Sequence, residues 1–517
     1  MRKQAGSLSL VALIWAASVA NLNLAVANVA LPDIGRALNA SQVGLNLVAV
    51  GFTLGLAASV LYLGAIGDRY GRKPILIAGL ALSIALAAVA AWAPSIEVLI
   101  AARLLGGIAA GMVYPTTLAM IVALFDGQKR TQAIALWSGI GAGASAIGPF
   151  IVGWLLTFAW WGSTFAISIP LAVIALGLAF FLPGNLDKSD QPVDNIGGLL
   201  SIVMVATLIA AITFAPMPNL GTVALVLGCV TLVAIVLFVL RQKRAKNPIF
   251  NLTIAKRRLF WVAALAGIIV FGSLMGAFFI GQQFLQNVLG YSTFQAGAAV
   301  LPAAVTMIAM SPVAGMLIPR IGSRKTLMIG FIAVGVAFAL MFTWTDSSPY
   351  LIVGIVYALL GSGVAIAAAP ASRSIMSAVP PEELGMGSAM NDLQRDLGGA
   401  IMQAVMGSLL VARYAGEISA AFASAPAAQQ AGLTDQAVAQ LSSSFAGAES
   451  VAKSLPQADQ ATLIQAAQQA FTSGSNSAFL FALGAVIIGL ILITVAYPKK
   501  AQELALEAQY AEPPKSQ

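Results

Sequence analysis

The sequence predicts an all-α membrane protein with about fourteen transmembrane helices, because apolar stretches of about 20 residues, enough to cross a bilayer, recur along the chain. Composition supports this class: of 517 residues, 59% are apolar and only 9% are charged. Soluble domains carry roughly a quarter charged residues. The mean hydropathy of +0.90 agrees with a chain that lies mostly in lipid.

Each predicted span is an apolar stretch with few or no charges. In chain order the stretches lie near residues 8–32, 44–65, 74–93, 96–125, 131–156, 163–183, 195–215, 219–240, 258–286, 296–318, 326–344, 349–372, 385–412 and 477–497. The first stretch is longer than the apolar region of a signal peptide, so we expect it to remain as a membrane anchor.

Basic residues cluster in alternate loops, which is the bias of cytoplasmic loops. The clusters follow the second, fourth, eighth and tenth stretches and lie near both ends of the chain. We therefore expect both termini to be cytoplasmic and the chain to be a multi-pass protein of the inner or plasma membrane. The net charge of +8 follows from this asymmetry, and no nucleic-acid partner is expected.

Several chemistries are excluded by what the sequence lacks. There is no histidine, and the single cysteine, Cys229, lies within a predicted span, so neither a metal site nor an intramolecular disulfide is expected. No catalytic cluster is present, so we expect no enzyme and no cofactor. A phosphate-binding G-x-x-x-x-G-K-[ST] loop is also missing, which argues against direct ATP drive.

A faint internal repeat divides the chain into two halves. "GAIGDRYGRK" (64–73) reappears as "GMLIPRIGSRK" (315–325), and "GIAAGMVYP" (107–115) is echoed by "SGVAIAAAP" (362–370). Duplicated six-helix halves around a midplane site are typical of transporters. Chance similarity among Gly/Ala-rich helices is the alternative.

The repeat predicts six-helix bundles at 1–190 and 257–497, with two additional helices and a basic cytoplasmic linker at 191–256. Residues 413–476, rich in Ala, Gln and Ser, are expected to form a long external loop. We favour a flexible spacer there over short amphipathic helices. Residues 498–517 are expected to be a disordered cytoplasmic tail.

The segment 64–73 has the features of a latch between the halves. Its glycines allow close helix approach and a tight turn, and its charges can bind across an interface in one conformation only. Positive-inside topology alone explains neither the acid nor the glycine spacing. The segment resembles the signature loop of the major facilitator superfamily, G-x-x-x-D-R-x-G-R-K. The candidate latch residues, which include an acid from the next loop on this side, are Gly64, Asp68, Arg69, Gly71, Arg72 and Asp126.

Fourteen spans with an extra helix pair resemble the drug:proton antiporter branch of that superfamily, of the EmrB/QacA type. "LIAARLLGGIAAGMVYP" (99–115) resembles its fourth-helix motif, and "GPFIVGW" (148–154) is similar to its G-P-x-x-G-G motif, through Gly148, Pro149 and Gly153. The resemblance implies a major facilitator fold that exports hydrophobic or amphipathic molecules by alternating access and proton antiport. For the Gly-Pro bend, simple helix packing is the alternative to a role in exchange.

"NLNLAVANVALP" (21–32) resembles the branch's first-helix motif, in which Asn23 takes the place of the usual acid. An amide cannot carry a proton. Asp392 and Asp396 lie well inside a predicted span on one helical face, beside Arg395. Our hypothesis is that proton coupling resides on these acids; a static pair of Arg395 with Asp396 is the rival.

Arg103 lies in an apolar helix, where a charge is a functional candidate by default. The resemblance implies a role in proton coupling, and a structural hydrogen bond to backbone carbonyls is the alternative. The substrate site is expected at the midplane between the halves, although each candidate could equally be packing. The candidates are Asn23, Tyr114, Trp137, Gln282, Gln283, Gln286, Met390 and Asn391.

The predicted function is therefore secondary transport, with multidrug-type efflux of lipophilic small molecules against protons. A proton-independent facilitator, or a flippase-like exporter of lipids or lipophilic metabolites, is the alternative. The expected partners are a lipophilic substrate, protons and the lipid bilayer, and the chain is expected to act as a monomer.

Overall fold

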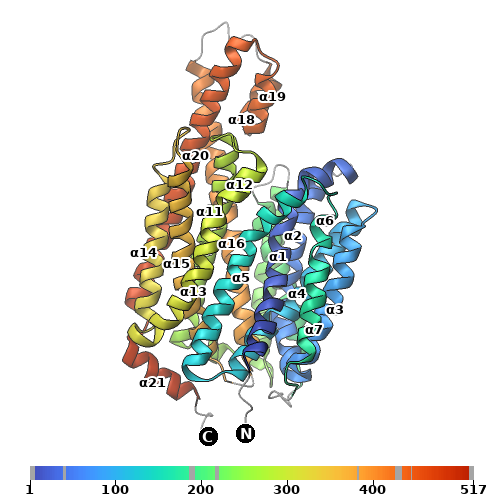
Figure 1. Ribbon diagram of the computed structural model, residues 1–517, viewed down its shortest axis with the longest axis vertical. Helices are drawn as coiled ribbons and strands as arrows, with labels where there is room; N and C mark the ends of the chain where they lie inside the picture. Colours follow the sequence, from blue (N-terminus) through green and yellow to red (C-terminus); the bar gives the residue numbers. More distant parts are fainter. Residues whose placement is uncertain are drawn as a thin grey trace.

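The computed structural model describes residues 6–38, 42–184, 192–215, 220–380, 383–424, 434–443 and 445–511. These residues form helices and no strand (Figure 1). Fourteen of the described helical segments are long and apolar enough to cross a membrane, which confirms the predicted number.

The first half begins with five long helices, followed by a span broken into α6 and α7. Their bounds are α1 (Ser7–Leu38), α2 (Gln42–Tyr70), α3 (Arg72–Ala91), α4 (Ile96–Leu124), α5 (Gly127–Leu155), α6 (Ser163–Ala166) and α7 (Ser168–Phe180). The helices of the additional pair are α8 (Asn195–Phe214) and α9 (Gly221–Arg244).

The second half contains six spanning helical segments with shorter helices between them. Their bounds are α10 (Leu252–Ala255), α11 (Arg258–Asn287), α12 (Thr293–Ala299), α13 (Leu301–Ile321), α14 (Ser323–Met341), α15 (Tyr350–Ser377), α16 (Leu384–Ser424), α18 (Asp435–Ser443), α19 (Phe445–Ala452), α20 (Gln457–Ala496) and α21 (Lys500–Ala511).

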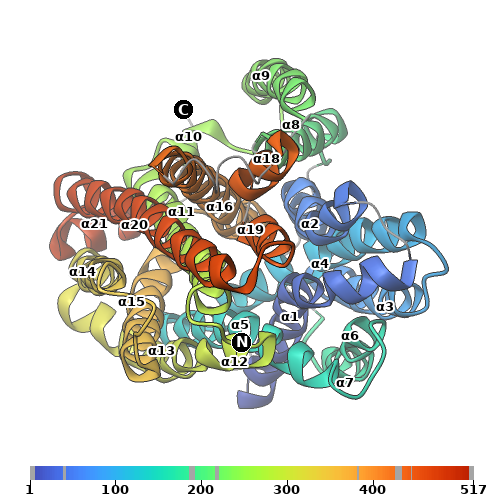
Figure 2. The ribbon, with the colours of Figure 1, turned by 90° about the horizontal axis from the view of Figure 1, so that it is seen from above.

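The two halves stand side by side and meet mainly where α5 packs on α13 and α15, and where α16 packs on α2 and α4 (Figures 1 and 2). The pair α8 and α9 lies at the periphery, with α8 against α2 (Figure 2). Arg241 near the end of α9 joins Asp194, just before α8, by an ion pair of 2.8 Å. The predicted domain boundaries are compatible with this arrangement and remain predictions.

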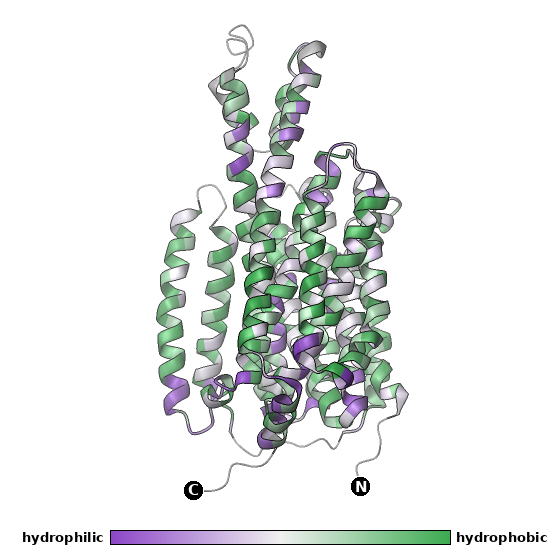
Figure 3. Cartoon of the chain, turned by 90° about the vertical axis from the view of Figure 1, so that its left-hand side faces the viewer, coloured by the Kyte–Doolittle hydropathy of each residue, from purple (hydrophilic) through white to green (hydrophobic). Residues whose placement is uncertain are grey.

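The outer surface of the bundle is apolar along most of its height (Figure 3). On α9, Leu225, Leu232 and Val233 are among the exposed side chains. Helices that satisfy their own backbone hydrogen bonds and expose such side chains are suited to lipid. The start of α1 and helix α21 lie at the same side of the bundle, where Figure 1 marks the two termini.

The expectation of a flexible spacer at 413–476 is wrong for the described part of that segment. Helix α16 continues to Ser424, α20 begins at Gln457, and α18 and α19 lie between them. Alanine and glutamine are good helix formers, so polarity alone does not predict a loop. Tyr414 and Phe445 pack on Phe471 with ring centroids 6.4 and 6.0 Å away, which gives this projecting part its own apolar contacts. Residues 425–433 and 444 lie outside the described residues.

The tail expected to be disordered also contains a packed helix, α21, while residues 512–517 lie outside the described residues. Glu503 is buried, accepts a hydrogen bond from the Ser323 amide at 3.1 Å and pairs with Arg373 at 3.1 Å. Burial raises the pKa of Glu503, and the hydrogen bonds from Ser323 and the charge of Arg373 offset this only in part. These contacts, which hydropathy does not register, hold α21 against the bundle.

Candidate functional site

A small cavity lined by both polar and apolar side chains lies between the two halves. It has a volume of about 20 Å³, which is space for about one water molecule. A bulky substrate therefore enters only after the helices separate. The lining residues come from α1, α4 and α5 of the first half and from α11 and α16 of the second: Asn21, Tyr114, Trp137, Ser138, Ser145, Phe271, Leu274, Met275, Asn391 and Arg395.

Arg395 on α16 is the group that joins the halves at this cavity. Its Nη1 donates to Asn21 Oδ1 at 2.7 Å, and its guanidinium lies 4.2 Å from the centre of the Tyr114 ring. Its Nε also donates to Asp396 Oδ1, at 3.4 Å. One cation thus contacts an amide, an aromatic face and an acid at once, a role suited to the planar fork of arginine.

The aromatic wall of the cavity is built by α4 and α5. The rings of Tyr114 and Trp137 lie 4.9 Å apart and tilted, and the Trp137 indole N–H donates to Thr117 Oγ1 at 3.0 Å. These contacts fix the orientation of both rings. Both rings are buried and the Arg395 guanidinium already covers the Tyr114 ring, so another cation can stack there only after Arg395 moves.

The two acids lie on the same face of α16 and are buried, Asp392 completely. Neither carboxylate oxygen of Asp392 has a hydrogen-bond partner among the described residues, and the same holds for Asp396 Oδ2. The only ion pair that the structure describes for Asp396 is its long contact with Arg395. An intramembrane acid with unmet hydrogen-bonding capacity is a candidate for a functional role.

Arg103 is held by backbone carbonyls and aromatic rings. Its Nη1 donates to the Asn23 carbonyl at 3.1 Å, and its Nε to the Val48 carbonyl at 3.4 Å. Its guanidinium also lies 4.7 Å from the Phe52 ring centre and 5.5 Å from that of Phe165. This is the structural alternative considered for Arg103, and no ion pair with a described acid accompanies it.

Asn23 does not line the central cavity. Its side-chain N–H₂ donates to the Val19 carbonyl on its own helix at 3.0 Å. Asn21, two residues earlier, is the amide that reaches the cavity and binds Arg395. Matching the motif selected the wrong asparagine for this cavity, and the quoted stretch contains both.

Four of the candidate latch residues form one structure at the end of the bundle where α1 begins. Asp68 Oδ1 pairs with Arg72 at 2.9 Å, and Asp68 Oδ2 accepts a hydrogen bond of 2.7 Å from the Gly385 amide of α16. A Cβ on Gly64 would lie 2.7 Å from the Gly385 carbonyl, so only glycine permits this approach. Gly71, with a φ of 106°, makes the turn into α3.

The other two candidates lie at the surface of the same end. Asp126 pairs with Arg130 on α5 at 2.9 Å, and its side chain is 69% exposed. Arg69 is partly exposed. The structure therefore places Asp68 at the contact between the halves.

The residues of the Gly-Pro motif lie in α5, with Pro149 inside the helix. Next to it, Phe150 meets Phe294 of α12 with ring centroids 5.5 Å apart. The motif therefore lies along a contact between the halves, at the end opposite the latch.

Four further substrate candidates lie away from the central cavity. Gln282 donates to the Ala296 carbonyl at 2.8 Å, Gln283 donates to Phe279 of its own helix at 3.1 Å, and Gln286 is exposed near the end of α11. Met390 packs against an apolar cluster that includes Leu393. Of the predicted substrate residues, the cavity brings together Tyr114, Trp137 and Asn391.

A family model described as "Major Facilitator Superfamily" matches residues 13–403. The chain belongs to this superfamily. The resemblance of its signature loop is therefore confirmed, and this superfamily member is a membrane transporter rather than an enzyme.

Relatives of this superfamily member extend the comparison over most of its length. It is 31% identical to the multidrug efflux pump LfrA of Mycolicibacterium smegmatis, over 86% of this chain and 87% of that protein. It is 30% identical to the methyl viologen resistance protein SmvA of Salmonella typhimurium, over 90% and 93%. The human organic anion transporter MFSD10 (TETRAN) shares the fold, with a TM-score of 0.60 and 16% identity over 94% of this chain and 98% of that one.

Proposed function

We propose that this superfamily member exports lipophilic cations and related amphipathic molecules in exchange for protons. The observation that carries the proposal is the buried cluster of Asp392, Arg395 and Asp396 on α16, whose arginine lines the central cavity and contacts Asn21 and Tyr114 there. The names of LfrA and SmvA support drug export, and methyl viologen is itself a cation.

The charges of the cluster suggest how a proton and a cation exclude each other. With both acids ionised, Asp392, Asp396 and Arg395 sum to one negative charge, which attracts a cationic substrate. With one acid protonated the sum is zero, and with both protonated it is positive. The positive charge that then remains on Arg395 would repel a cationic substrate about 6 Å away by roughly 3 kcal/mol, at an effective dielectric constant of about 20. Protonation at one face of the membrane would therefore favour release of the cation there.

Alternating access requires that contacts between the halves break at one end at a time. At the end where α1 begins, the bond from the Gly385 amide to Asp68 and the close approach of Gly64 hold the helices together. We propose that this end is cytoplasmic, as the basic loops predict, and that the chain lies in the cell membrane. Opening toward the cytoplasm then requires loss of the Asp68 bond to α16.

The positions of Asn23 and Arg103 support a structural role for both. Arg103 ties the Asn23 carbonyl of α1 to the Val48 carbonyl of α2 and so fixes the helix that carries Asn21. We infer that Arg103 is a positioning residue and that proton coupling does not pass through Asn23.

The test is efflux of a fluorescent lipophilic cation from cells, with and without a protonophore. The variant is Asp392→Asn with Asp396→Asn, and Asp126→Asn is the matched control because its carboxylate is exposed. We expect the protonophore and the double substitution each to abolish net efflux, while the control stays active. Efflux that resists both would instead favour a proton-independent facilitator. Membrane levels of each variant are measured in parallel.

A further inference from the structure

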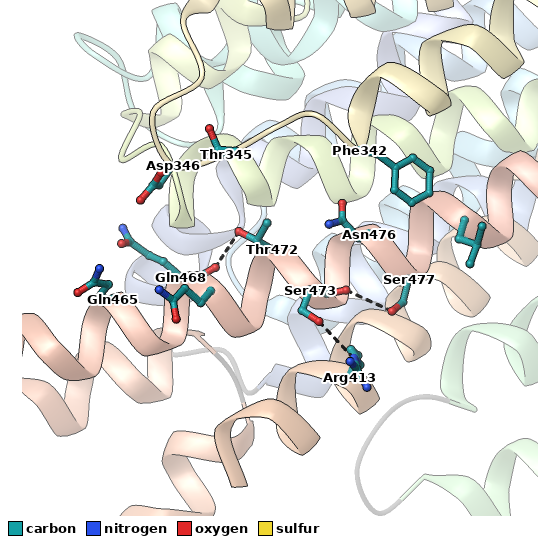
Figure 4. A pocket seen from close by; sticks show the side chains of 12 residues that line it. Phe342, Thr345, Asp346, Arg413, Gln465, Gln468, Thr472, Ser473, Asn476 and Ser477 are labelled. Carbon is teal, nitrogen blue, oxygen red and sulfur yellow. Dashed lines mark hydrogen bonds between the residues drawn. The ribbon is translucent and has the colours of Figure 1, made fainter. Parts of the chain in front are cut away.

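A second, larger cavity opens at the opposite end of the second half. Its volume is about 690 Å³, and it lies between α20, α16 and the connection from α14 to α15 (Figure 4). No residue that lines it lines the central cavity. The lining residues are Phe342, Thr345, Asp346, Arg413, Gln465, Gln468, Gln469, Thr472, Ser473, Asn476, Ser477 and Leu480.

The polarity of this groove changes along α20. Leu480, 61% exposed, continues the apolar surface formed by Ile487 and Ile488 further along the helix. Hydroxyl groups follow at Ser477 and Ser473. At a rise of about 1.5 Å per residue, Ser473 lies roughly 10 Å from Leu480 along the helix axis.

Beyond the hydroxyl groups the groove is rich in amides, from Gln465 to Gln469, and Asp346 lies on the facing connection (Figure 4). This change from apolar to amide side chains is the one expected of a groove that passes from lipid into the headgroup region.

Opposite charges lie in different parts of the groove. Arg413 lies beside Ser473, to whose Oγ its Nε donates at 3.2 Å (Figure 4). Its Nη2 pairs with Glu417 at 2.8 Å, and the Ser473 hydroxyl donates to Glu417 at 3.1 Å. Asp346 lies on the other wall, near Gln465 and Gln468 (Figure 4). Together Arg413, Glu417 and Asp346 sum to one negative charge, so the groove does not favour an anionic headgroup.

We propose that this groove binds the headgroup of a phospholipid that ends in a primary ammonium group, as in phosphatidylethanolamine. The phosphate would accept hydrogen bonds from Arg413, since arginine is suited to phosphate recognition. The Ser473 hydroxyl, which donates to Glu417 at 3.1 Å, would remain the acceptor that orients Arg413. The ammonium group would donate its three N–H bonds to Asp346 and to the amide oxygens beyond it. The acyl chains would lie over Leu480.

The volume agrees with this occupant, because sites for small molecules span about 300–1,000 Å³. A trimethylated choline headgroup has no N–H donors, and a glycerol headgroup leaves the lipid anionic. Binding should therefore be strongest for ethanolamine, weaker for choline and weakest for glycerol lipids.

The test uses the purified full-length chain in detergent, with binding of short-chain phosphatidylethanolamine, phosphatidylcholine and phosphatidylglycerol measured by native mass spectrometry and by the shift in Tm. Asp346→Asn removes the exposed carboxylate and should weaken ethanolamine-lipid binding about threefold while leaving choline-lipid binding unchanged. Ser473→Trp fills the groove and should abolish the preference. Glu449→Gln on α19 is the control, because it removes an exposed acid outside the groove.

Retention of the ethanolamine preference in the Ser473→Trp variant would overturn the proposal, as would equal binding of all three lipids to the unaltered chain. Since the readout is lipid binding rather than efflux, these outcomes are independent of the transport proposal.

Discussion

The hydrogen bond from the Gly385 amide to Asp68 allows an estimate of how much one contact stabilises the closed state of this end of the bundle. Asp68 is 6% exposed and makes two contacts, one to Arg72 and one to Gly385. Arg72 belongs to the same half as Asp68, so that ion pair persists whether the halves are together or apart. Of the two contacts of Asp68, only the Gly385 bond is lost when α16 moves away, so this bond is the contribution of Asp68 to the equilibrium.

A hydrogen bond to a charged group contributes about 1.5–3 kcal/mol. Asp68→Ala should therefore raise the ratio of open to closed molecules at this end roughly ten- to hundredfold. Asp68→Asn retains an oxygen for the Gly385 amide and should have a smaller effect, about tenfold or less.

The assay is maleimide labelling of a cysteine placed at Ser372, which is buried at the interface 3.4 Å from Ser138 of the other half. Cys229 is the only native cysteine, so a Cys229→Ala background leaves one reactive thiol. We expect labelling to be faster in Asp68→Asn than with Asp68 present, and fastest in Asp68→Ala. Labelling at the same rate in Asp68→Ala as in the exposed-acid variant Asp126→Asn would refute the reasoning, provided that both variants retain their Tm.

Three further predictions address the central site and the terminal helix. Arg395→Lys should lower the initial efflux rate at least about tenfold at unchanged membrane level, because an ammonium group cannot replace the fork that serves Asn21 and Tyr114 together; near-normal efflux would argue against this contact. Asn23→Asp should not restore efflux to the variant lacking both acids of α16, and rescue in the same assay would place residue 23 in the coupling path. The pKa of Glu503 is raised above its ordinary value of 4.5, so this group stabilises docked α21 most at low pH, and docking should weaken as pH rises from 4.5 through the raised pKa. Amide hydrogen exchange of α21, corrected for its intrinsic pH dependence, should show this trend, and Glu503→Gln should flatten it.

The number and positions of the spans could be predicted because a helix in lipid must be apolar and must satisfy its own backbone. The latch could be predicted because few explanations other than contact account for glycines and an acid so close together where α2 ends and α3 begins. The helical continuations of α16 and α20 outside the membrane could not, since a hydropathy pattern registers lipid and not the packing of Tyr414 and Phe445 on Phe471.

The error over Asn21 and Asn23 has a geometric cause. Two residues along an α-helix differ by about 200° in direction, so the two amides point to opposite sides of α1. The motif indicates which helix carries the amide, but the rotation of that helix is set by its neighbours. Here Arg103 fixes the Asn23 carbonyl on one side, which leaves Asn21 facing Arg395 on the other.

Helix α16 connects the three sites described above. Gly385 binds the latch acid, Arg395 lies in the central cavity, and Arg413 lines the groove at the far end. At about 1.5 Å per residue, these positions lie roughly 15 and 42 Å along one continuous helix. A Cβ on Gly398 would overlap the backbone of α11, so the two helices are in close contact there. We expect α16 and α11 to tilt together for this reason. We therefore expect a movement that breaks the Asp68 bond at one end to displace Arg395 from Asn21 as well, which would make loss of the latch and exposure of the acids a single event.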